Sequence, residues 1–202
     1  DITERKHAGQ TLSESERRFR TLVANIPGAI YRCDVDKEWT MSYLSDTIES
    51  IVGYSASEFN ANHVRSYASV IHPDDRRLVE EVTWASLQEH RPYVIEYRLV
   101  HANGTVRWVY EKGQGVFTSS GEVRFLDGAI FDITERKQAE QALRESEERF
   151  SKAFRTSPHP IGITEVITGR CVEVNDACLE AFGFRREEVI GNTTFLLGIW
   201  PK

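Results

Sequence analysis

Two heptad-like stretches of apolar residues stand near the start and the middle of the chain. Apolar or small residues recur at spacings of four and three at Ala8, Leu12, Ser15, Phe19 and Leu22, and again at Ala139, Leu143, Ser146, Phe150 and Ala153. The Glu, Arg and Gln residues between them favour helix. The pattern therefore predicts two amphipathic helices. Each is expected to pair with a partner helix or, alternatively, to pack on its own domain.

The same two stretches belong to an internal repeat. Nineteen residues from Asp1 recur with 14 identities in the nineteen from Asp132, an offset of 131 residues. That offset is the size of one ordinary domain plus its linker. Fainter similarity pairs Ser45-Asp46 with Asn175-Asp176. A second module is therefore expected to begin near Phe150 and to be present only in part.

Between the two helical stretches, the pattern changes to short strands and helices. Strands are expected where apolar and polar residues alternate, and helices where capping residues precede an apolar turn. In chain order, the expected strands are 29–34, 39–44, 93–101, 105–118 and 122–131, and the expected helices end near Gly53, Phe59 and Pro92. In the longest of these helices, Leu78 and Val82 are expected to face inward. Two strands, a helical middle and three strands favour an α+β fold with an antiparallel sheet and its helices on one face.

Five short motifs in this order make the chain resemble the PAS family of sensory domains. They are Ile71-His72-Pro73-Asp74-Asp75, Ile95-Glu96-Tyr97-Arg98, Asn103-Gly104-Thr105, Arg107-Trp108-Val109 and Asp132-Ile133-Thr134-Glu135-Arg136. The resemblance implies a five-stranded sheet of order 2-1-5-4-3 that encloses a small cavity with its helices. It also implies that output leaves through Asp132, Ile133 and Thr134 into the following helix.

Four segments are expected on this basis. Residues 1–16 would be a signalling helix from a preceding module, and residues 17–132 a complete PAS domain. Residues 133–149 would form a second signalling helix, with Ala139, Leu143 and Phe150 on its dimer-forming side. Residues 150–202 would be the N-terminal half of a second PAS domain.

A small-ligand pocket is one interpretation of the apolar and aromatic residues inside the first module. Such sites combine aliphatic and aromatic walls with a few polar tips, and a glycine in a strand allows close approach of the backbone. The alternative is a core filled by the same side chains. The candidate residues are Tyr31, Ile51, Val70, Leu78, Val82, Ile95, Tyr97, Leu99, Trp108 and Gly128.

No resident cofactor is expected, although a small organic ligand remains an open alternative. A flavin-thiol photosensor is disfavoured because neither Cys33 nor Cys178 lies in the Asn-Cys-Arg context that light-sensing relatives use. Haem is disfavoured because His72 and His90 lie at the two ends of the long helix, away from its inward stripe. No metal site is expected, and the cysteines are interpreted as small buried hydrophobic residues.

Composition limits the classes of molecule that the chain is expected to bind. A net charge of −6 and a pI near 5.6 disfavour nucleic acid and anionic membrane, which both require a basic face. Three cysteines without a CxxC pair favour a reducing, cytoplasmic setting. No apolar run is long enough to span a bilayer, so any membrane anchor is expected outside this sequence.

Two functions remain open at this level. The first is a sensory module that relays ligand or redox state through the exit helix to an output domain. A histidine kinase is the commonest output among similar proteins, and a diguanylate cyclase is the second. The other is a ligand-free homodimerisation module that sets helix register. The fragment itself is not expected to be an enzyme, because it has no phosphate-binding loop, HExxH or GxSxG motif.

Overall fold

A computed structural model describes residue 14, residues 17–18 and residues 21–193. Of the expected N-terminal seam, Ala8, Leu12, Ser15 and Phe19 lie outside the described residues, whereas Leu22 is described and is 61% exposed. The chain divides into two compact units, residues 1–137 and residues 138–202. Each unit is described by itself.

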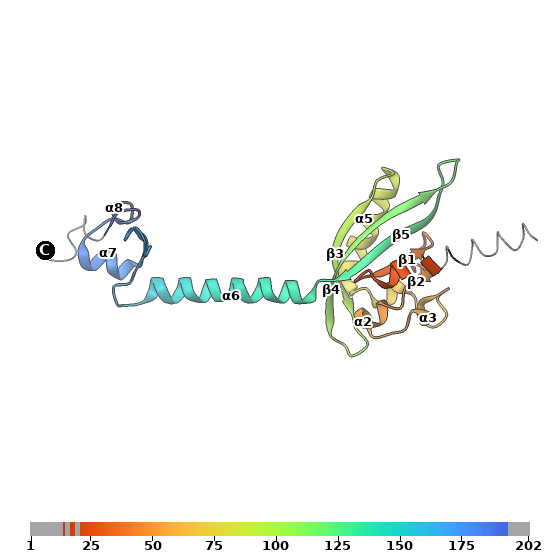
Figure 1. Cartoon of the computed structure of the whole chain (residues 1–202), viewed down its shortest axis with the longest axis horizontal. Helices are drawn as coiled ribbons and strands as arrows, with labels where there is room; N and C mark the ends of the chain where they lie inside the picture. The colour runs from red at the N-terminus through yellow and green to blue at the C-terminus, as the bar shows by residue number, and fades with distance from the viewer. Residues whose placement is uncertain (1–13, 15–16, 19–20, 194–202) are drawn as a thin grey trace, which may run out of the picture. The chain divides into compact units, whose positions relative to one another are not determined.

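The first unit is built on a five-stranded antiparallel sheet. Its strands are β1 (Ala29–Cys33), β2 (Met41–Leu44), β3 (Tyr93–Val100), β4 (Val106–Phe117) and β5 (Val123–Asp132). Their spatial order is β2-β1-β5-β4-β3, which confirms the predicted topology. In Figure 1 the long hairpin of β4 and β5 forms the middle of this sheet.

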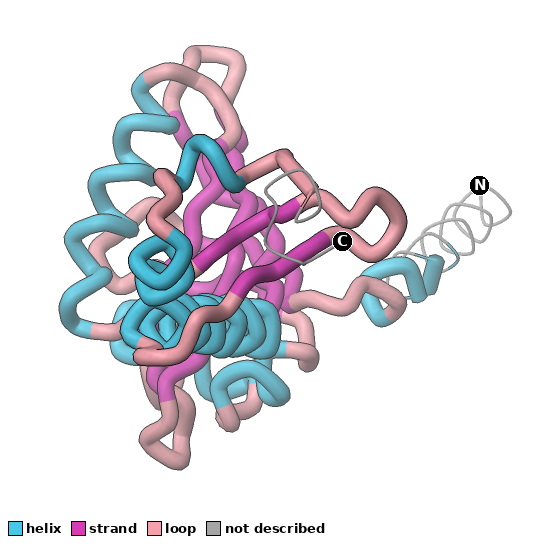
Figure 2. Tube along the Cα trace, turned by 90° about the vertical axis from the view of Figure 1, so that its left-hand side faces the viewer, coloured by secondary structure: helices cyan, strands magenta, loops and turns pink. Residues whose placement is uncertain are grey.

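Short helices connect β2 to β3 and pack on one face of the sheet. They are α2 (Ile48–Val52), α3 (Ala56–Phe59), α4 (Tyr67–Val70), a 3-10 turn (Pro73–Asp75) and α5 (Arg76–Gln88). Figure 2 shows the strands of this unit side by side with helices beside them. Gly53 ends α2 in the left-handed conformation, as glycine does at many helix C-termini. The result is the predicted α+β architecture.

The inward face of α5 differs by one residue from the prediction. Its buried residues include Val79, Thr83 and Leu87, whereas 45% of Leu78 is exposed. Val82 is partly buried against the core. Since successive helical residues are about 100° apart, a shift of one position moves the buried stripe from Leu78 to Val79.

Alternation along the strands decides which residues face the helices. On β3 the residues Tyr93, Ile95, Tyr97 and Leu99 are all buried, and on β4 Val109 and Glu111 are buried. Trp108 precedes Val109, so it belongs to the opposite face of the sheet. The expectation that Trp108 lines the interior is therefore wrong.

A long helix starts where the five-stranded sheet ends. Strand β5 stops at Asp132, and α6 (Thr134–Thr156) begins two residues later (Figure 1). The backbone N–H of Ile133, the residue between them, still bonds to the Trp108 carbonyl of β4 at 2.9 Å. No flexible linker therefore separates the sheet from the helix.

The second unit repeats the opening of the first. It contains β6 (Gly162–Thr164), β7 (Cys171–Val174), α7 (Asp176–Phe182) and α8 (Arg186–Val189). In the first unit the Ser45 hydroxyl accepts the Ile30 N–H at 2.9 Å, and in the second the Asn175 side chain accepts the Ile161 N–H at the same distance. The sequence repeat is thus also a repeat of hydrogen bonding.

Candidate functional site

A buried carboxylate occupies the centre of the first unit's interior. Glu111 lies on β4, is only 5% exposed and accepts hydrogen bonds from three phenol groups. Tyr31 of β1 and Tyr93 of β3 donate to its Oε1, and Tyr97 of β3 donates to its Oε2. Tyr67 of α4 lies 2.7 Å from the Tyr97 hydroxyl. Four tyrosines therefore converge on one acid between the sheet and the helices.

Two glycines make room for this arrangement. Across the sheet the register runs Tyr31, Gly128, Gly113, Tyr93 on β1, β5, β4 and β3. A Cβ added at Gly128 would lie 2.5 Å from the Tyr31 hydroxyl, and one at Gly113 would lie 2.6 Å from the Tyr93 hydroxyl. The two phenol rings therefore lean over the glycines and meet above them.

The proton count of this cluster fits an ionised Glu111. Each phenol has one proton, and three of these protons point at the carboxylate. Tyr97 donates to Glu111, so Tyr67 must donate to Tyr97. Every phenol proton then has an acceptor without any proton on the acid. Such charge-assisted hydrogen bonds are about twice as strong as neutral ones.

The electrostatic environment keeps the phenols protonated. Burial, followed by the charge of Glu111, raises the pKa of Tyr31, Tyr67 and Tyr97 well above 10.0. The same two causes raise the pKa of Tyr93. In the described part of the chain, no Lys, Arg or His forms an ion pair with Glu111. Neutral hydroxyl groups alone therefore solvate a buried negative charge.

Beside Glu111 is a small internal cavity of about 10 Å³. That volume holds about one water-sized molecule. Haem and flavin are far larger than this cavity, so neither could occupy it without a large displacement of side chains. The lining residues are Tyr31, Cys33, Trp39, Met41, Tyr67, Val79, Thr83, Tyr93, Glu111 and Leu126.

The ten predicted pocket residues are only partly brought together. Tyr31 and Tyr97 contact Glu111, and Gly128 lies beneath the Tyr31 ring. Leu78 and Trp108 do not face the interior. The others, which pack in the apolar core or against it, are Ile51, Val70, Val82, Ile95 and Leu99.

The residues weighed for cofactors have other partners here. Cys33 lies beside the tyrosine cluster, where burial and the Glu111 charge raise the pKa of its thiol. The His72 ring accepts the Asp74 N–H at 3.4 Å, and His90 stacks on Phe117 with ring centroids 4.3 Å apart. Among the described residues no group of three His, Cys, Asp or Glu is arranged to hold a metal ion.

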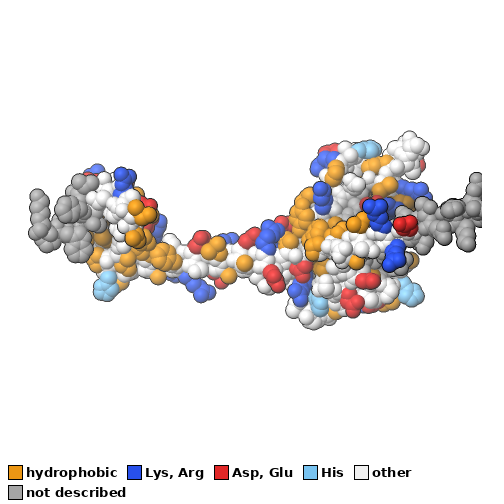
Figure 3. Space-filling view, viewed as in Figure 1, with side chains coloured by type: hydrophobic (Ala, Val, Ile, Leu, Met, Phe, Trp, Pro, Cys, Tyr) orange, Lys and Arg blue, Asp and Glu red, His pale blue; other side chains and the backbone are white. Residues whose placement is uncertain are grey.

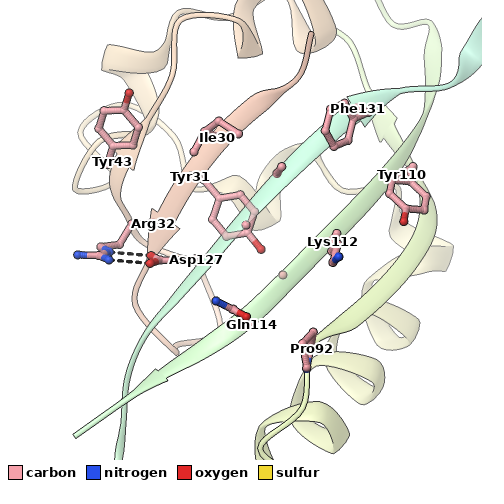
Figure 4. Close-up of a pocket in the computed structure, with 13 residues that line it drawn as sticks. Ile30, Tyr31, Arg32, Tyr43, Pro92, Tyr110, Lys112, Gln114, Asp127 and Phe131 are labelled. Atoms are coloured by element: carbon pink, nitrogen blue, oxygen red, sulfur yellow. Dashed lines mark hydrogen bonds and ion pairs between the residues drawn. The ribbon is translucent and has the colours of Figure 1, made fainter. Parts of the chain in front are cut away.

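A larger concavity lies on the opposite, outer face of the sheet (Figure 4). Its volume is about 940 Å³, and its walls are mainly aromatic and aliphatic. The Arg32–Asp127 ion pair, at 2.6 Å, lies at one side. Other walls are Ile30, Tyr43, Pro92, Tyr110, Lys112, Gln114, Ala129 and Phe131.

The junction between β5 and α6 is held by a compact set of hydrogen bonds. Asp132 Oδ1 accepts the Thr134 N–H at 2.8 Å, which caps the helix start. The Thr134 hydroxyl, whose residue is 5% exposed, accepts the Trp108 N–H at 3.0 Å. Arg107 Nη1 lies 3.8 Å from Asp132 Oδ2. The predicted exit residues thus connect α6 directly to β4.

Ion pairs hold the first turn of α6 to β3 as well. Glu96 Oε1 pairs with Arg136 at 2.6 Å and Glu96 Oε2 with Lys137 at 2.7 Å. Lys137, followed by Arg136, lowers the pKa of Glu96. The Lys137 ammonium also lies 5.3 Å from the Trp108 ring centroid, within the range of a cation–π contact.

This network continues to the start of α5. The Arg98 guanidinium lies 5.7 Å from the Trp108 ring centroid and bonds to both oxygens of Asp75 at 2.6 and 2.9 Å. The Arg98 hydrogen bonds lower the pKa of Asp75. A continuous set of contacts therefore joins the helical face of the domain to α6.

Along α6 the predicted dimer-forming residues lie on the surface. Ala139 is exposed, and Leu143 and Phe150 are 61% and 58% exposed. Figure 3 shows hydrophobic side chains along this helix among charged ones of both signs. The pairs Arg144–Glu148 and Glu145–Arg149, four residues apart, support the helix itself.

Sequence reasoning missed Glu111, Tyr67, Tyr93 and Trp39. A signal for Glu111 was present, because strict alternation from Val109 places Glu111 and Gly113 on the same inward face. An acid in an inward position needs buried donors, and Tyr93 and Tyr97 alternate on the neighbouring strand. Tyr67 carried no comparable signal, since it lies outside the regular strand pattern. Trp39 was assigned to the expected strand 39–44, but β2 begins only at Met41.

Comparison with protein families gives two matches. Residues 41–130 match a family described as the PAS fold, and residues 148–201 match one described as the PAS domain. A solved structure of a sensory box histidine kinase/response regulator from Burkholderia thailandensis is 33% identical. That match covers 67% of this chain and 98% of the other, with a TM-score of 0.54.

Curated relatives are longer proteins. An uncharacterized protein of Sinorhizobium fredii is 33% identical over 70% of this chain and 16% of its own length. The sensor protein FixL of Bradyrhizobium diazoefficiens is 26% identical over 81% of this chain and 32% of its own length. The chain thus spans at most about a third of these two relatives.

Proposed function

Because the chain belongs to the PAS family of sensory domains, we propose that its first unit is the input part of a longer signalling protein and that α6 carries the signal onward. The observation that supports this role most strongly is the junction between β5 and α6. The sheet and the helix are held directly to each other, because Thr134 forms a hydrogen bond with Trp108 and Lys137 forms an ion pair with Glu96. A change in the sheet must then move, bend or release α6.

The input is assigned to the interior around Glu111. This carboxylate is on β4, the strand whose Trp108 backbone holds Thr134. Binding or chemistry that moved Glu111 would shift the hydrogen bonding of β4 against β3 and β5. Two arrangements of this cluster, each with its own position of α6, would form a bistable element of the kind signalling requires.

The output partner is proposed by analogy with the relatives. FixL is described as a sensor protein and the Burkholderia protein as a histidine kinase, so a histidine kinase downstream in the same chain is the proposed output, with a diguanylate cyclase as the alternative. The fragment itself is proposed to bind and transmit rather than to catalyse. A cytoplasmic location is proposed with it. No helix of the described segments has the length and apolar character of a membrane span.

Substitution at the junction tests this function. In the full-length protein, Thr134→Val removes the hydrogen bonds to Trp108 with little change in shape, and Asp132→Ala removes the cap. Both are expected to uncouple output activity from the input while the sheet stays folded. Glu147→Ala, on the exposed surface of α6, is the matched control. Normal signalling by both junction variants, with a normal control, would refute the proposed relay.

A ligand-free dimerisation module is the second candidate. Two observations favour it: the cavity beside Glu111 has a volume of only about 10 Å³, and Leu143 and Phe150 are exposed along α6. Native mass spectrometry with an absorbance spectrum separates the two candidates. A bound mass or a visible absorption band supports sensing, whereas an empty and tight dimer supports the scaffold role.

A further inference from the structure

The cavity beside Glu111 has an unusual chemical lining. One wall is a buried carboxylate, and four others are the aromatic side chains of Tyr31, Trp39, Tyr67 and Tyr93. Each of these five residues is at most 6% exposed. The Thr83 hydroxyl, on α5, adds a further polar group. Aromatic rings and a carboxylate are the two groups that proteins use to bind organic cations.

The charge of the cluster favours a positive occupant. Three phenols solvate Glu111, but no cationic side chain of the described residues compensates its charge. A buried charge without a counter-ion is unfavourable, even when hydrogen bonds surround it. A cation in the adjoining cavity would offset that cost, whereas an anion would increase it.

Trp39 is held at the cavity by a strained loop. Its φ of 52° lies in the left-handed region, which is uncommon for a bulky residue. Asp36 fixes this loop, since its Oδ1 accepts the N–H groups of Glu38 and Thr40 at 3.0 and 3.1 Å. The strained backbone conformation of Trp39 therefore places its indole in the wall of the cavity that Glu111 also lines. Strained residues of this kind are concentrated at ligand-binding and switch regions.

From this combination we infer that the first unit binds a water-sized cation, the ammonium ion, between Glu111 and the aromatic walls. The cavity volume of about 10 Å³ sets the size limit. A water-sized cation fits with minor side-chain movement, whereas tetramethylammonium does not. The inference rests on the proposed function in one respect only, that this interior is the input site.

Thermal unfolding of the 202-residue chain tests the inference directly. The probe is ammonium chloride, compared at equal ionic strength with sodium chloride and with tetramethylammonium chloride. For a millimolar dissociation constant, about 0.1 M ammonium is expected to raise the melting temperature by about 5 °C relative to sodium. No comparable rise is expected with tetramethylammonium.

Three variants separate specific binding from a general salt effect. Glu111→Gln keeps the shape of the side chain but removes its charge, and Thr83→Ile fills the cavity without touching the charge. Both are expected to lose the ammonium-dependent rise in melting temperature. Glu122→Gln, in the exposed turn before β5, is expected to keep it. If Glu111→Gln does not fold, Thr83→Ile and the titration of ¹⁵N-labelled ammonium followed by NMR still decide the question.

Specific outcomes overturn the inference. These are an equal rise with sodium, a rise that persists in Thr83→Ile, or no rise and no bound ¹⁵N signal in the unaltered chain. In the last case the cavity holds water alone. The relay is tested separately by Thr134→Val, so a failed cation test leaves the relay intact, and a failed relay test leaves the binding site intact.

Discussion

The hydroxyl oxygens of Tyr31 and Tyr93 lie 2.8 Å apart, although their strands are separated by two others. Adjacent strands are about 4.8 Å apart, so the two backbones are about 14 Å apart across the sheet. The rings bridge this distance only because the intervening register positions are Gly128 and Gly113. Glu111 then accepts a hydrogen bond from both phenols.

Gly128→Ala and Gly113→Ala are expected to destabilise the first unit by about 1–3 kcal/mol each, because overpacking forces neighbouring side chains out of place. The new methyl at position 128 would meet Tyr31, so Gly128→Ala combined with Tyr31→Leu should cost less than the sum of the single changes. Urea unfolding of the four proteins measures this coupling. If the two changes in unfolding free energy were strictly additive, Gly128 would not be needed to accommodate the Tyr31 ring. Gly162→Ala, where a Cβ meets only ordinary contacts, is the control.

Alkaline titration should reveal four tyrosines that resist ionisation in the folded protein. Tyr31, Tyr67, Tyr93 and Tyr97 have a pKa in the folded state above the ordinary value of 10.0. A raised pKa means that the stability from the neutral phenols is fully present below about pH 10 and is lost as the pH rises further. Ultraviolet absorbance at 295 nm should therefore report four phenols that ionise only upon unfolding. Smooth ionisation of these four in the folded protein would contradict the buried cluster.

The Asp75–Arg98 pair should contribute to stability against acid. Asp75 has a folded pKa below its ordinary value of 3.8, so its contribution is present above about pH 4 and is lost as the pH falls through the lower folded value. Asp75→Asn is expected to cost about 2 kcal/mol at pH 7 and to flatten the acid limb of the stability curve. Asp34→Asn, at an exposed position, is the control. An unchanged acid limb in Asp75→Asn would refute the assignment.

The fold could be predicted from sequence because its signals are redundant. Five alternating strands, the Asn103-Gly104-Thr105 motif between two of them and the repeated segment from Asp132 all indicate the same topology. The direction of individual side chains was harder to predict. An error of one residue in the helix or strand repeat moves Leu78 from the interior to the surface and places Trp108 on the other face of the sheet. The site was only half found, with Tyr31, Tyr97 and Gly128 identified and Glu111 missed. A charged residue is assigned to the surface unless the strand phase is known, and that phase depends on tertiary pairing.

Exposed residues on α6 should control self-association. In the dimer proposed to form through α6, Leu143→Asp places a charge in the predicted seam. It is expected to weaken that dimer by at least tenfold, because an unpaired charge in an apolar seam must lose its water. Size-exclusion chromatography with light scattering, run across a range of concentrations, measures this change. Glu147→Gln is the matched control. A dimer of unchanged strength in Leu143→Asp would place the contact elsewhere.

Hydrogen exchange at the start of α6 tests the central claim most directly. That claim is that a change in the interior around Glu111 also changes the first turn of α6. The amide of Lys137, bonded to the Ile133 carbonyl at 3.0 Å, reports the first turn of that helix. In Glu111→Gln, exchange in the first turn of α6 is predicted to rise together with exchange in β4. Faster exchange in β4 with no change at Lys137 would contradict the account.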